Sequence, residues 1–402
     1  MRILICASDT PFHPVNTGYR RQLMGLVPEL GKRNDVRLIG YRFPEQSANP
    51  AVDIDMRVID YVRPSSLRSL GDVAAAVALR RPVRAERLAS GLRGPLREEI
   101  ARFKPDVVHI GPGKLAGLLP DLGGLPCVLG VMDAWHLNVD ARAEVARGIR
   151  KPLFRLDAKL IRRFEATRYR GFGRVVPSNE GDRDELRALD STLPFTIIPI
   201  GFDASAYAPD PSAEVDRNRI IFHGAMNYAP NVTTVQYLVE QVLPLVRAQH
   251  PAANVVLVGR DPAPEVVALG KLDGVTVTGP VEDMRSWITG SRVWAGPFLS
   301  GTGIKTKLLE AMATDIPCVV TPLGHRGLDD ITSGTQLLVG STPKELADHL
   351  VRVLSDDDFA RKLGHTGGEY VRPKYDWSAV GRAFEEVYAT VVAEKKREAF
   401  RS

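Results

Sequence analysis

The chain has 402 residues, 44% of them hydrophobic and 25% charged, a composition typical of folded globular proteins that excludes disordered, collagen-like and coiled-coil chains. At roughly 150 residues per domain, this length predicts two or three domains and excludes a single small binding module. The 53 Lys and Arg residues exceed the 48 Asp and Glu residues by only five, so we expect no broad nucleic-acid footprint and no nucleic-acid partner.

Short apolar segments rich in Val and Ile alternate with longer segments of helical period, which indicates parallel sheets built from strand-helix-strand units. Two such series follow one another, and each is long enough for one doubly wound sheet. The strands expected in the first series are residues 2–7, 36–42, 57–62, 106–110, 127–132 and 174–177. Those expected in the second series are residues 219–223, 254–258, 275–278, 292–295, 318–321 and 336–339.

A segment rich in Pro, Gly, Ser and Asp, residues 198–216, separates the two series as a linker or hinge does. We therefore predict an α/β protein with one Rossmann-like domain over residues 1–195 and a second over residues 196–376. Residues 377–402 are expected to form a helix that packs back on the first domain.

Three cysteines, Cys6, Cys127 and Cys318, lie far apart in strand-like segments and support neither a disulfide framework nor a zinc site. The chain enters its first expected strand at once and holds no apolar stretch long enough to span a bilayer, so we expect a cytoplasmic protein. Residues 80–104 and 140–174 are rich in Arg and Lys. They are expected to be solvated helix faces, or, alternatively, to attract a phosphorylated acceptor or the inner face of a membrane.

The segment 297–313 carries the clearest chemical signal, and it joins an expected strand to an expected helix. Gly301 and Gly303 let the backbone approach a ligand closely, and the N–H groups and dipole at the amino end of a helix favour a bound anion. Lys305 and Lys307 add positive charge. The segment predicts an anion site, with a glycine turn used only for packing as the alternative.

The helix that follows is expected to be amphipathic, with Ile304 and Leu308 on its apolar side. Since four residues make about one turn, Thr302, Thr306 and Glu310 are expected on one stripe. A diphosphate at the helix end, with ribose hydroxyls near Glu310, matches that layout.

Four further segments accompany this one in a recurring order. They are residues 222–231 (Phe-His-Gly-Ala-Met-Asn-Tyr-Ala-Pro-Asn), 258–260 (Val-Gly-Arg), 275–283 (Val-Thr-Val-Thr-Gly-Pro-Val-Glu-Asp) and 317–328 (Pro-Cys-Val-Val-Thr-Pro-Leu-Gly-His-Arg-Gly-Leu). Together they resemble the donor-binding half of the family-four retaining glycosyltransferases of the GT-B fold, in the subgroup whose loop contains Gly-x-Gly-Ile-Lys-x-Lys-x-Leu-Glu-Ala. The resemblance implies two facing Rossmann-like sheets with a cleft between them, the acceptor in the first domain and the nucleotide sugar in the second.

By this resemblance, Glu310 matches the glutamate that holds the nucleotide ribose, whereas the family's other glutamate is replaced by Thr302. Ala225 stands where the family has a phosphate-binding arginine, which leaves Lys305, with Arg260, to supply positive charge. The turn that starts at Gly279 is expected to meet the base through backbone groups. The donor-binding residues expected in all are Gly18, Gly224, Met226, Arg260, Gly279, Val281, Gly301, Thr302, Gly303, Ile304, Lys305, Thr306 and Glu310.

In the N-terminal half, the resemblance makes Gly18 a point of close backbone approach to the phosphate or the transferred sugar, with a plain surface turn as the alternative. Residues 130–137 end a strand that should point at the ligand-binding edge. The catalytic candidates are Asp133 and His136 in this segment, together with Lys305. His109, inside an expected strand, is interpreted as a core histidine, and the remaining candidates to line the donor site are His223 and His325.

The implied activity is transfer of a sugar from a nucleotide-diphosphate sugar to a hydroxyl, with retention at the anomeric carbon and with neither metal nor further cofactor. The acceptor is expected to be a saccharide, a lipid-linked glycan or a small natural product. A sugar-nucleotide epimerase or hydrolase on the same fold is the first alternative. A non-enzymatic basic protein that binds nucleic acid or membrane is the second.

Overall fold

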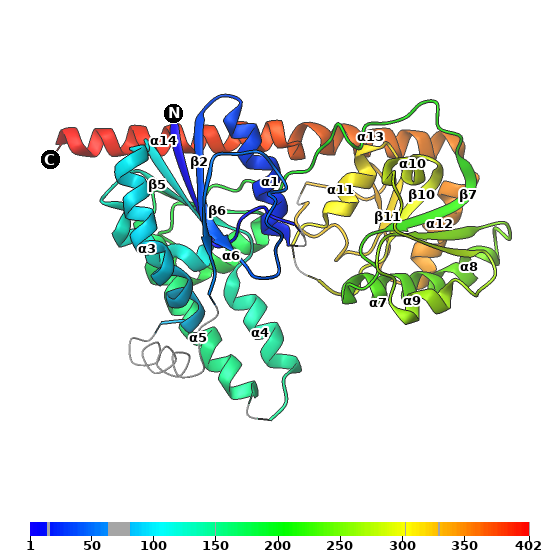
Figure 1. The fold of residues 1–402 in the computed structure, drawn as a ribbon. Helices are drawn as coiled ribbons and strands as arrows, with labels where there is room; N and C mark the ends of the chain where they lie inside the picture. Colours follow the sequence, from blue (N-terminus) through cyan, green and yellow to red (C-terminus); the bar gives the residue numbers. More distant parts are fainter. Residues whose placement is uncertain (14–16, 63–80, 149, 302, 329, 402) are drawn as a thin grey trace. The chain divides into compact units, whose positions relative to one another are not determined.

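The computed structural model describes residues 1–13, 17–62, 81–148, 150–301, 303–328 and 330–401. Two compact units divide the chain: unit 1 contains Met1–Ile200 and Val380–Ser402, and unit 2 contains Gly201–Ala379. The first division falls within the Pro- and Gly-rich segment 198–216. Each unit contains one parallel six-stranded sheet with helices packed on it, so the fold belongs to the predicted α/β class (Figure 1).

The strands of unit 1 are β1 (Arg2–Ala7), β2 (Asp35–Arg42), β3 (Met56–Asp60), β4 (Val107–Gly111), β5 (Cys127–Val131) and β6 (Arg174–Pro177). Its helices are α1 (Gly18–Gly31), α3 (Val83–Phe103), α4 (Trp135–Val145), α5 (Arg150–Arg168) and α6 (Glu180–Leu189), with short 3-10 helices η1 (Gly113–Leu122) and η2 (Tyr169–Gly171). The strand order is β3-β2-β1-β4-β5-β6, and the order reverses between β1 and β4. Ligands of open parallel sheets bind at the carboxyl ends of strands at such a reversal.

Alternate residues of the unit 1 strands face opposite layers. Leu4 and Cys6 of β1 join a core with α3, η1 and α5, whereas His109 of β4 faces the long C-terminal helix α14 (Trp377–Arg401). His109 Nδ1 lies 2.7 Å from the Tyr388 hydroxyl, and its ring packs on Phe384. Burial lowers the pKa of His109 to about 4, so the imidazole is neutral at pH 7. His109 is therefore the core histidine that the sequence predicts, and it ties α14 to the sheet.

The strands of unit 2 are β7 (Asp216–His223), β8 (Asn254–Val258), β9 (Val275–Gly279), β10 (Ser291–Gly296), β11 (Cys318–Val320) and β12 (Leu338–Val339). Its helices are α7 (Ala229–Tyr237), η3 (Leu238–Val242), α8 (Leu243–Arg247), α9 (Pro264–Leu269), α10 (Met284–Thr289), α11 (Thr306–Ala313), α12 (Pro343–Ser355) and α13 (Asp357–Tyr375). The order is β12-β11-β10-β7-β8-β9, with its reversal between β7 and β10. Ile304 precedes α11 rather than lying in it, because Lys305 is the N-cap and the loop backbone is still non-helical there.

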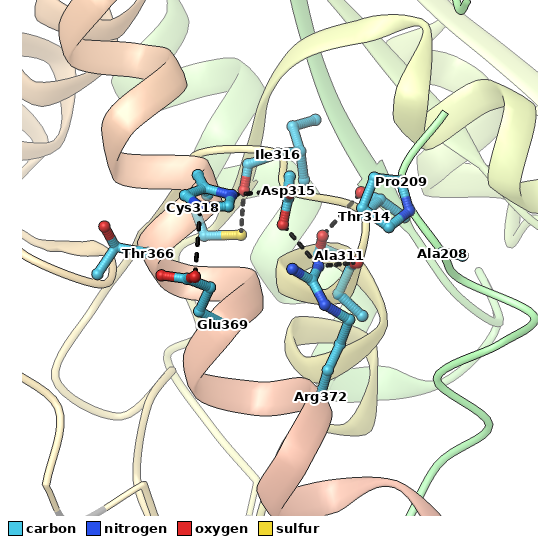
Figure 2. Close-up of polar contacts among 12 residues, drawn as sticks. Ala208, Pro209, Ala311, Thr314, Asp315, Ile316, Cys318, Thr366, Glu369 and Arg372 are labelled. Carbon is cyan, nitrogen blue, oxygen red and sulfur yellow. Dashed lines mark hydrogen bonds and ion pairs between the residues drawn. The ribbon is translucent and has the colours of Figure 1, made fainter. Parts of the chain in front are cut away.

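The end of α11 is held against α13 by a tight turn (Figure 2). Asp315 adopts a left-handed backbone with φ 61°, and its carboxylate accepts a 2.6 Å hydrogen bond from Arg372 Nη1. The same nitrogen donates to the Ala313 carbonyl at 2.8 Å. A Cβ atom on Gly364 would overlap the Asp315 carbonyl oxygen, so α13 approaches this closely only with glycine there. This packing fixes α11, and with it the loop that leads into the helix.

Candidate functional site

The first candidate site lies at the carboxyl edge of the unit 2 sheet, on either side of its strand-order reversal. Gly224 follows β7, Gly259 follows β8, and residues 297–305 connect β10 to α11. The structure thus brings the donor segments expected from the sequence to one edge of one sheet. That edge is the usual ligand-binding position in doubly wound folds.

Two glycines allow the loops after β7 and β8 to touch. Gly224 and Gly259 have φ values of 151° and 154°, which side chains rarely tolerate. A Cβ on Gly259 would overlap the Gly224 carbonyl oxygen. A Cβ on Gly224 would lie 2.8 Å from Asn231 Nδ2 and 2.9 Å from Lys307 Cε. Since no side chain fits at either position, backbone groups line this part of the edge.

The loop before α11 carries two lysines close to its backbone. Gly301 and Gly303 have positive φ values of 108° and 68°, and Lys305 Nζ donates a 2.8 Å hydrogen bond to the Gly303 carbonyl. Lys305 is 8% exposed. Its ammonium lies 5.8 Å, and that of Lys307 5.7 Å, from the centre of the Phe298 ring. Positive charge therefore gathers at the amino end of α11, where the helix dipole adds to it.

Glu310, one turn into α11, is oriented by a chain of hydrogen bonds. The indole N–H of Trp294 donates to His223 Nδ1 at 3.0 Å. Because Nδ1 accepts, the proton of the neutral imidazole sits on Nε2, which lies 2.9 Å from Glu310 Oε2 and donates to it. His223, at the end of β7, thus holds the carboxylate of Glu310 in place.

Met226 and Arg260 form a backbone bridge rather than a side-chain pair. The Met226 N–H donates to the Arg260 carbonyl at 2.9 Å, and the Met226 side chain is fully buried. The Arg260 guanidinium lies 3.0 Å from the Asp261 carboxylate, and both side chains are 54% exposed. Only the backbone of Met226 can face a ligand, whereas the Arg260 guanidinium stands at the surface beside an acid.

The remaining donor-site candidates of unit 2 lie around this edge. Gly279 ends β9 with φ 71°, and its carbonyl accepts from the Gly259 N–H at 3.2 Å. Val281 is half-buried against the unit 2 core. Thr306 opens α11, and Thr302 lies outside the described residues. His325 is half-buried in the turn after β11.

The second candidate site is a cavity of about 200 Å³ in unit 1, at the carboxyl ends of β4 and β5. Gly18, the first residue of α1, lines it together with Asp133, which follows β5. Lys114, at the start of η1, lines it too, and its ammonium lies 5.6 Å from the centre of the Trp135 ring. The structure therefore brings two sequence-predicted residues, Gly18 and Asp133, into one cavity. The full lining is Gly18, Tyr19, Pro112, Gly113, Lys114, Met132, Asp133, Trp135, Asn138 and Tyr169.

His136 lies in the first turn of α4, and it is not among the described residues that line this cavity. Its side chain is 2% exposed, with Nδ1 2.6 Å from Glu165 Oε2 and Nε2 3.6 Å from Glu185 Oε2. The other Glu165 oxygen accepts from the Trp135 N–H at 2.8 Å, at the start of α4. Burial opposes the charged imidazolium, but the hydrogen bond and charge of Glu165 outweigh it and raise the pKa of His136.

Sequence analysis missed Lys114 and Tyr19, which line this cavity, and Asp9, which lines a second cavity of unit 1. Asp9 follows β1, and Arg20 Nε donates to it at 2.9 Å; burial raises the pKa of Asp9 to about 6 despite that partner. Burial lowers the pKa of Lys114 to about 8, with Arg84 and Arg142 pushing in the same direction. The available signal was position, because Asp9 and Lys114 each follow the end of a strand beside the reversal of the sheet.

The described residues contain no group of three or more His, Cys, Asp and Glu side chains placed to hold a metal ion. Cys6, Cys127 and Cys318 are buried thiols, and burial raises the pKa of Cys127 to about 11. In the same described ranges, no helix combines the length and the apolar character that crossing a bilayer requires.

Comparison with known sequences connects unit 2 to a family. Residues 217–356 match the family described as "Glycosyl transferases group 1". A phosphatidyl-myo-inositol mannosyltransferase of Propionibacterium freudenreichii is 30% identical over 153 residues, which are 36% of this chain and 37% of the relative. A protein of the same name from Mycobacterium tuberculosis is 28% identical over 235 residues, 54% of this chain and 60% of the relative. The alignments thus span between about one third and three fifths of these relatives.

Comparison with solved structures confirms the predicted GT-B fold. Sucrose-phosphate synthase from Thermosynechococcus elongatus has a TM-score of 0.70 at 16% identity, covering 98% of this chain and 100% of that one. Anabaena HepE, solved in complex with UDP-glucose, has a TM-score of 0.62 at 14% identity, covering 97% and 100%. At these identities the likeness concerns the fold alone.

Proposed function

We propose that this chain, whose residues 217–356 belong to the group 1 glycosyl transferases and whose fold is GT-B, moves a sugar from a nucleotide diphosphate to an acceptor hydroxyl. The proposed transfer retains the configuration at the anomeric carbon and needs no metal. The mannosyltransferase relatives support a hexosyl donor. The observation that carries the proposal is the amino end of α11, where the positive end of the helix dipole and the ammonium groups of Lys305 and Lys307 lie together.

In unit 2, the diphosphate is proposed to sit at the start of α11. Gly303 and Thr306 approach it through the backbone, and the helix dipole and the Lys305 ammonium meet its charge. Glu310, held by His223, is proposed to accept hydrogen bonds from the ribose hydroxyls. The base is proposed to contact the backbone of the turn at Gly279.

The chemical step proposed is attack by the acceptor hydroxyl on the same face from which the diphosphate departs. The departing phosphate oxygen takes the acceptor proton as the bond to the sugar breaks. Lys305 then acts as a catalytic residue by stabilising charge that grows on the leaving group, which is an interaction stronger in the transition state than in the ground state.

In unit 1, the cavity at Gly18 and Asp133 is proposed to hold the reacting end of the acceptor. Asp133 is proposed to bind an acceptor or donor-sugar hydroxyl. His136, buried against Glu165, is proposed to act as a positioning residue that fixes the start of α4 beside Asp133.

The test of the donor site is calorimetric titration with UDP, GDP, ADP and dTDP. Lys305→Gln should weaken binding of the preferred nucleotide at least tenfold, because the variant loses a positive charge from the phosphate position. Lys271→Gln, an exposed lysine at the turn before β9, is the matched control and should bind like the wild type. An unchanged nucleotide affinity in Lys305→Gln would show that the nucleotide does not bind at this loop.

The test of the reaction is NMR of the product formed from the matching nucleotide sugar. Retention of the anomeric configuration is expected. An inverted linkage would contradict the proposed mechanism, and net isomerisation or fast hydrolysis of the donor without acceptor would favour the epimerase or hydrolase alternative.

A further inference from the structure

Unit 1 has a second, larger cavity that the donor chemistry does not use. Its volume is about 660 Å³, within the range that holds small ligands. It shares Tyr19, Pro112 and Lys114 with the smaller cavity at Gly18 and Asp133, so the two cavities are neighbours. A ligand that occupies both would lie against these three residues.

One wall of the larger cavity is apolar and aromatic. The Phe43 and Tyr61 rings pack together with centroids 4.8 Å apart. Helix α5 contributes leucines to the same cavity, and two of them, Leu153 and Leu156, are 59% and 47% exposed. Apolar surface that stays exposed beside a cavity marks a binding region for an apolar group. The apolar lining residues are Phe43, Tyr61, Leu153, Phe154, Leu156 and Leu160.

The part of the cavity nearest the smaller one carries positive charge. Lys114, Arg84 and Arg87 line it together with the acids Asp9 and Asp157. Asp9 is held by Arg20 at 2.9 Å. Because Lys114 is largely buried and has cationic neighbours, its ammonium is poorly stabilised by its surroundings, as its lowered pKa reflects. An anionic group at this position would offset that cost.

We propose that the acceptor is an anionic amphiphile, with its hydroxylated end at Gly18 and Asp133, its anionic group at Lys114, and its hydrocarbon chain along Phe43, Tyr61 and the α5 leucines. This proposal rests on the proposed glycosyl transfer, because that reaction is the reason for placing the hydroxylated end of the ligand at Gly18 and Asp133. The binding of an alkyl anion to unit 1 does not depend on that choice and can be measured by itself.

The experiment is calorimetric titration of the full chain with three probes: dodecyl phosphate below its micelle concentration, dodecyl maltoside and inorganic phosphate. Dodecyl phosphate should bind at least tenfold more tightly than either single-feature probe. Lys114→Gln, and separately the Leu153→Ser, Leu156→Ser double variant, should each weaken it at least tenfold. Equal binding of all three probes, or no loss in either variant, would overturn the proposal.

Matched controls separate this result from folding and from the donor site. Lys159→Gln removes an exposed lysine of the same helix α5, and Leu245→Ser removes an exposed leucine of unit 2; both should bind dodecyl phosphate like the wild type. Nucleotide affinity should be unchanged in every cavity variant. If no nucleoside diphosphate binds the wild-type chain, the proposed function fails. The dodecyl phosphate titration still tests whether the unit 1 cavity binds an alkyl anion.

Vesicles identify the source of the amphiphile. Sedimentation with phosphatidylcholine vesicles that contain phosphatidic acid, lost in Lys114→Gln and kept in Lys159→Gln, would support a bilayer lipid. Dodecyl phosphate binding without capture by vesicles would support a soluble alkyl phosphate. Both results support the same chemistry at Lys114.

Discussion

The two candidate sites are built in different ways. In unit 2, loops after β7, β8 and β10 present backbone, and the glycines at 224, 259, 301 and 303 are what let that backbone reach the edge. In unit 1, side chains from α1, α3, η1, α5 and the segments that follow β2 and β3 converge on two neighbouring cavities. A backbone site suits a constant group such as a diphosphate, whereas a side-chain site can be adapted to one acceptor.

The largest expected effect tests whether the unit 2 edge depends on glycine. Gly259→Ala should lower the free energy of unfolding of unit 2 by about 3 kcal/mol, because its Cβ would overlap the Gly224 carbonyl and φ 154° is strained for alanine. Chemical denaturation measures the loss. Gly94→Ala is the control, since nothing lies within 4 Å of a Cβ there and alanine favours helix α3. Equal stability of the two variants would contradict the backbone account of this edge.

The next effect separates the ribose from the phosphates in the same site. Glu310→Gln should weaken binding of the preferred nucleoside diphosphate roughly 10- to 100-fold, since hydrogen bonds to a charged group contribute about 1.5–3 kcal/mol. Inorganic diphosphate, which has no ribose, should bind the variant and the wild type alike. Glu265→Gln, at an exposed position in α9, is the control for the lost charge. An equal loss of affinity for both ligands would mean that Glu310 supports the loop structure and does not contact the ribose.

Local features of the sequence predicted unit 2 well. All six strands expected in unit 2 are present, and the anion-site segment does join β10 to α11, because hydrophobic period and glycine spacing depend only on neighbours in the chain. The start of α11 was placed two residues early. Glycine and lysine spacing shows that a helix follows a loop, whereas the N-cap at Lys305 depends on how the loop packs.

The unit 1 site could not be derived from the sequence in the same way. Lys114 and Tyr61 line one cavity although they lie far apart in the sequence, so no sequence motif links them. His136 was selected by its position after a strand, but Glu165, far along the chain, decides where its imidazole lies. A position after a strand makes all three of Asp133, Lys114 and His136 candidates. In the folded chain, Asp133 and Lys114 line the cavity, whereas His136 is buried against Glu165 of α5.

A smaller effect probes the charge on Lys114 in the larger cavity. Burial and the cations Arg84 and Arg142 set the pKa of Lys114 near 8, while Asp133 acts in the opposite direction. The ammonium loses its proton as pH rises, so affinity for octyl sulfate, whose charge stays constant, should fall up to about tenfold between pH 7 and pH 9. Lys114→Arg should bind without that decline. An octyl sulfate affinity that does not change with pH in the wild type would show that the anion does not bind beside Lys114.

The smallest effect tests whether His136 supports unit 1. Its folded pKa is raised by Glu165 above the ordinary value near 6.5, so the charged pair stabilises the fold fully below that value. This contribution is lost as pH rises through the folded pKa. The stability of the wild type, measured by denaturation, should therefore fall as the buffer changes from acid to weakly alkaline, and His136→Gln should show a smaller fall. His13→Gln, at an exposed position of the same unit, should keep the slope. An unchanged slope in His136→Gln, together with a lost turnover, would instead assign His136 to the reaction rather than to the support of α4.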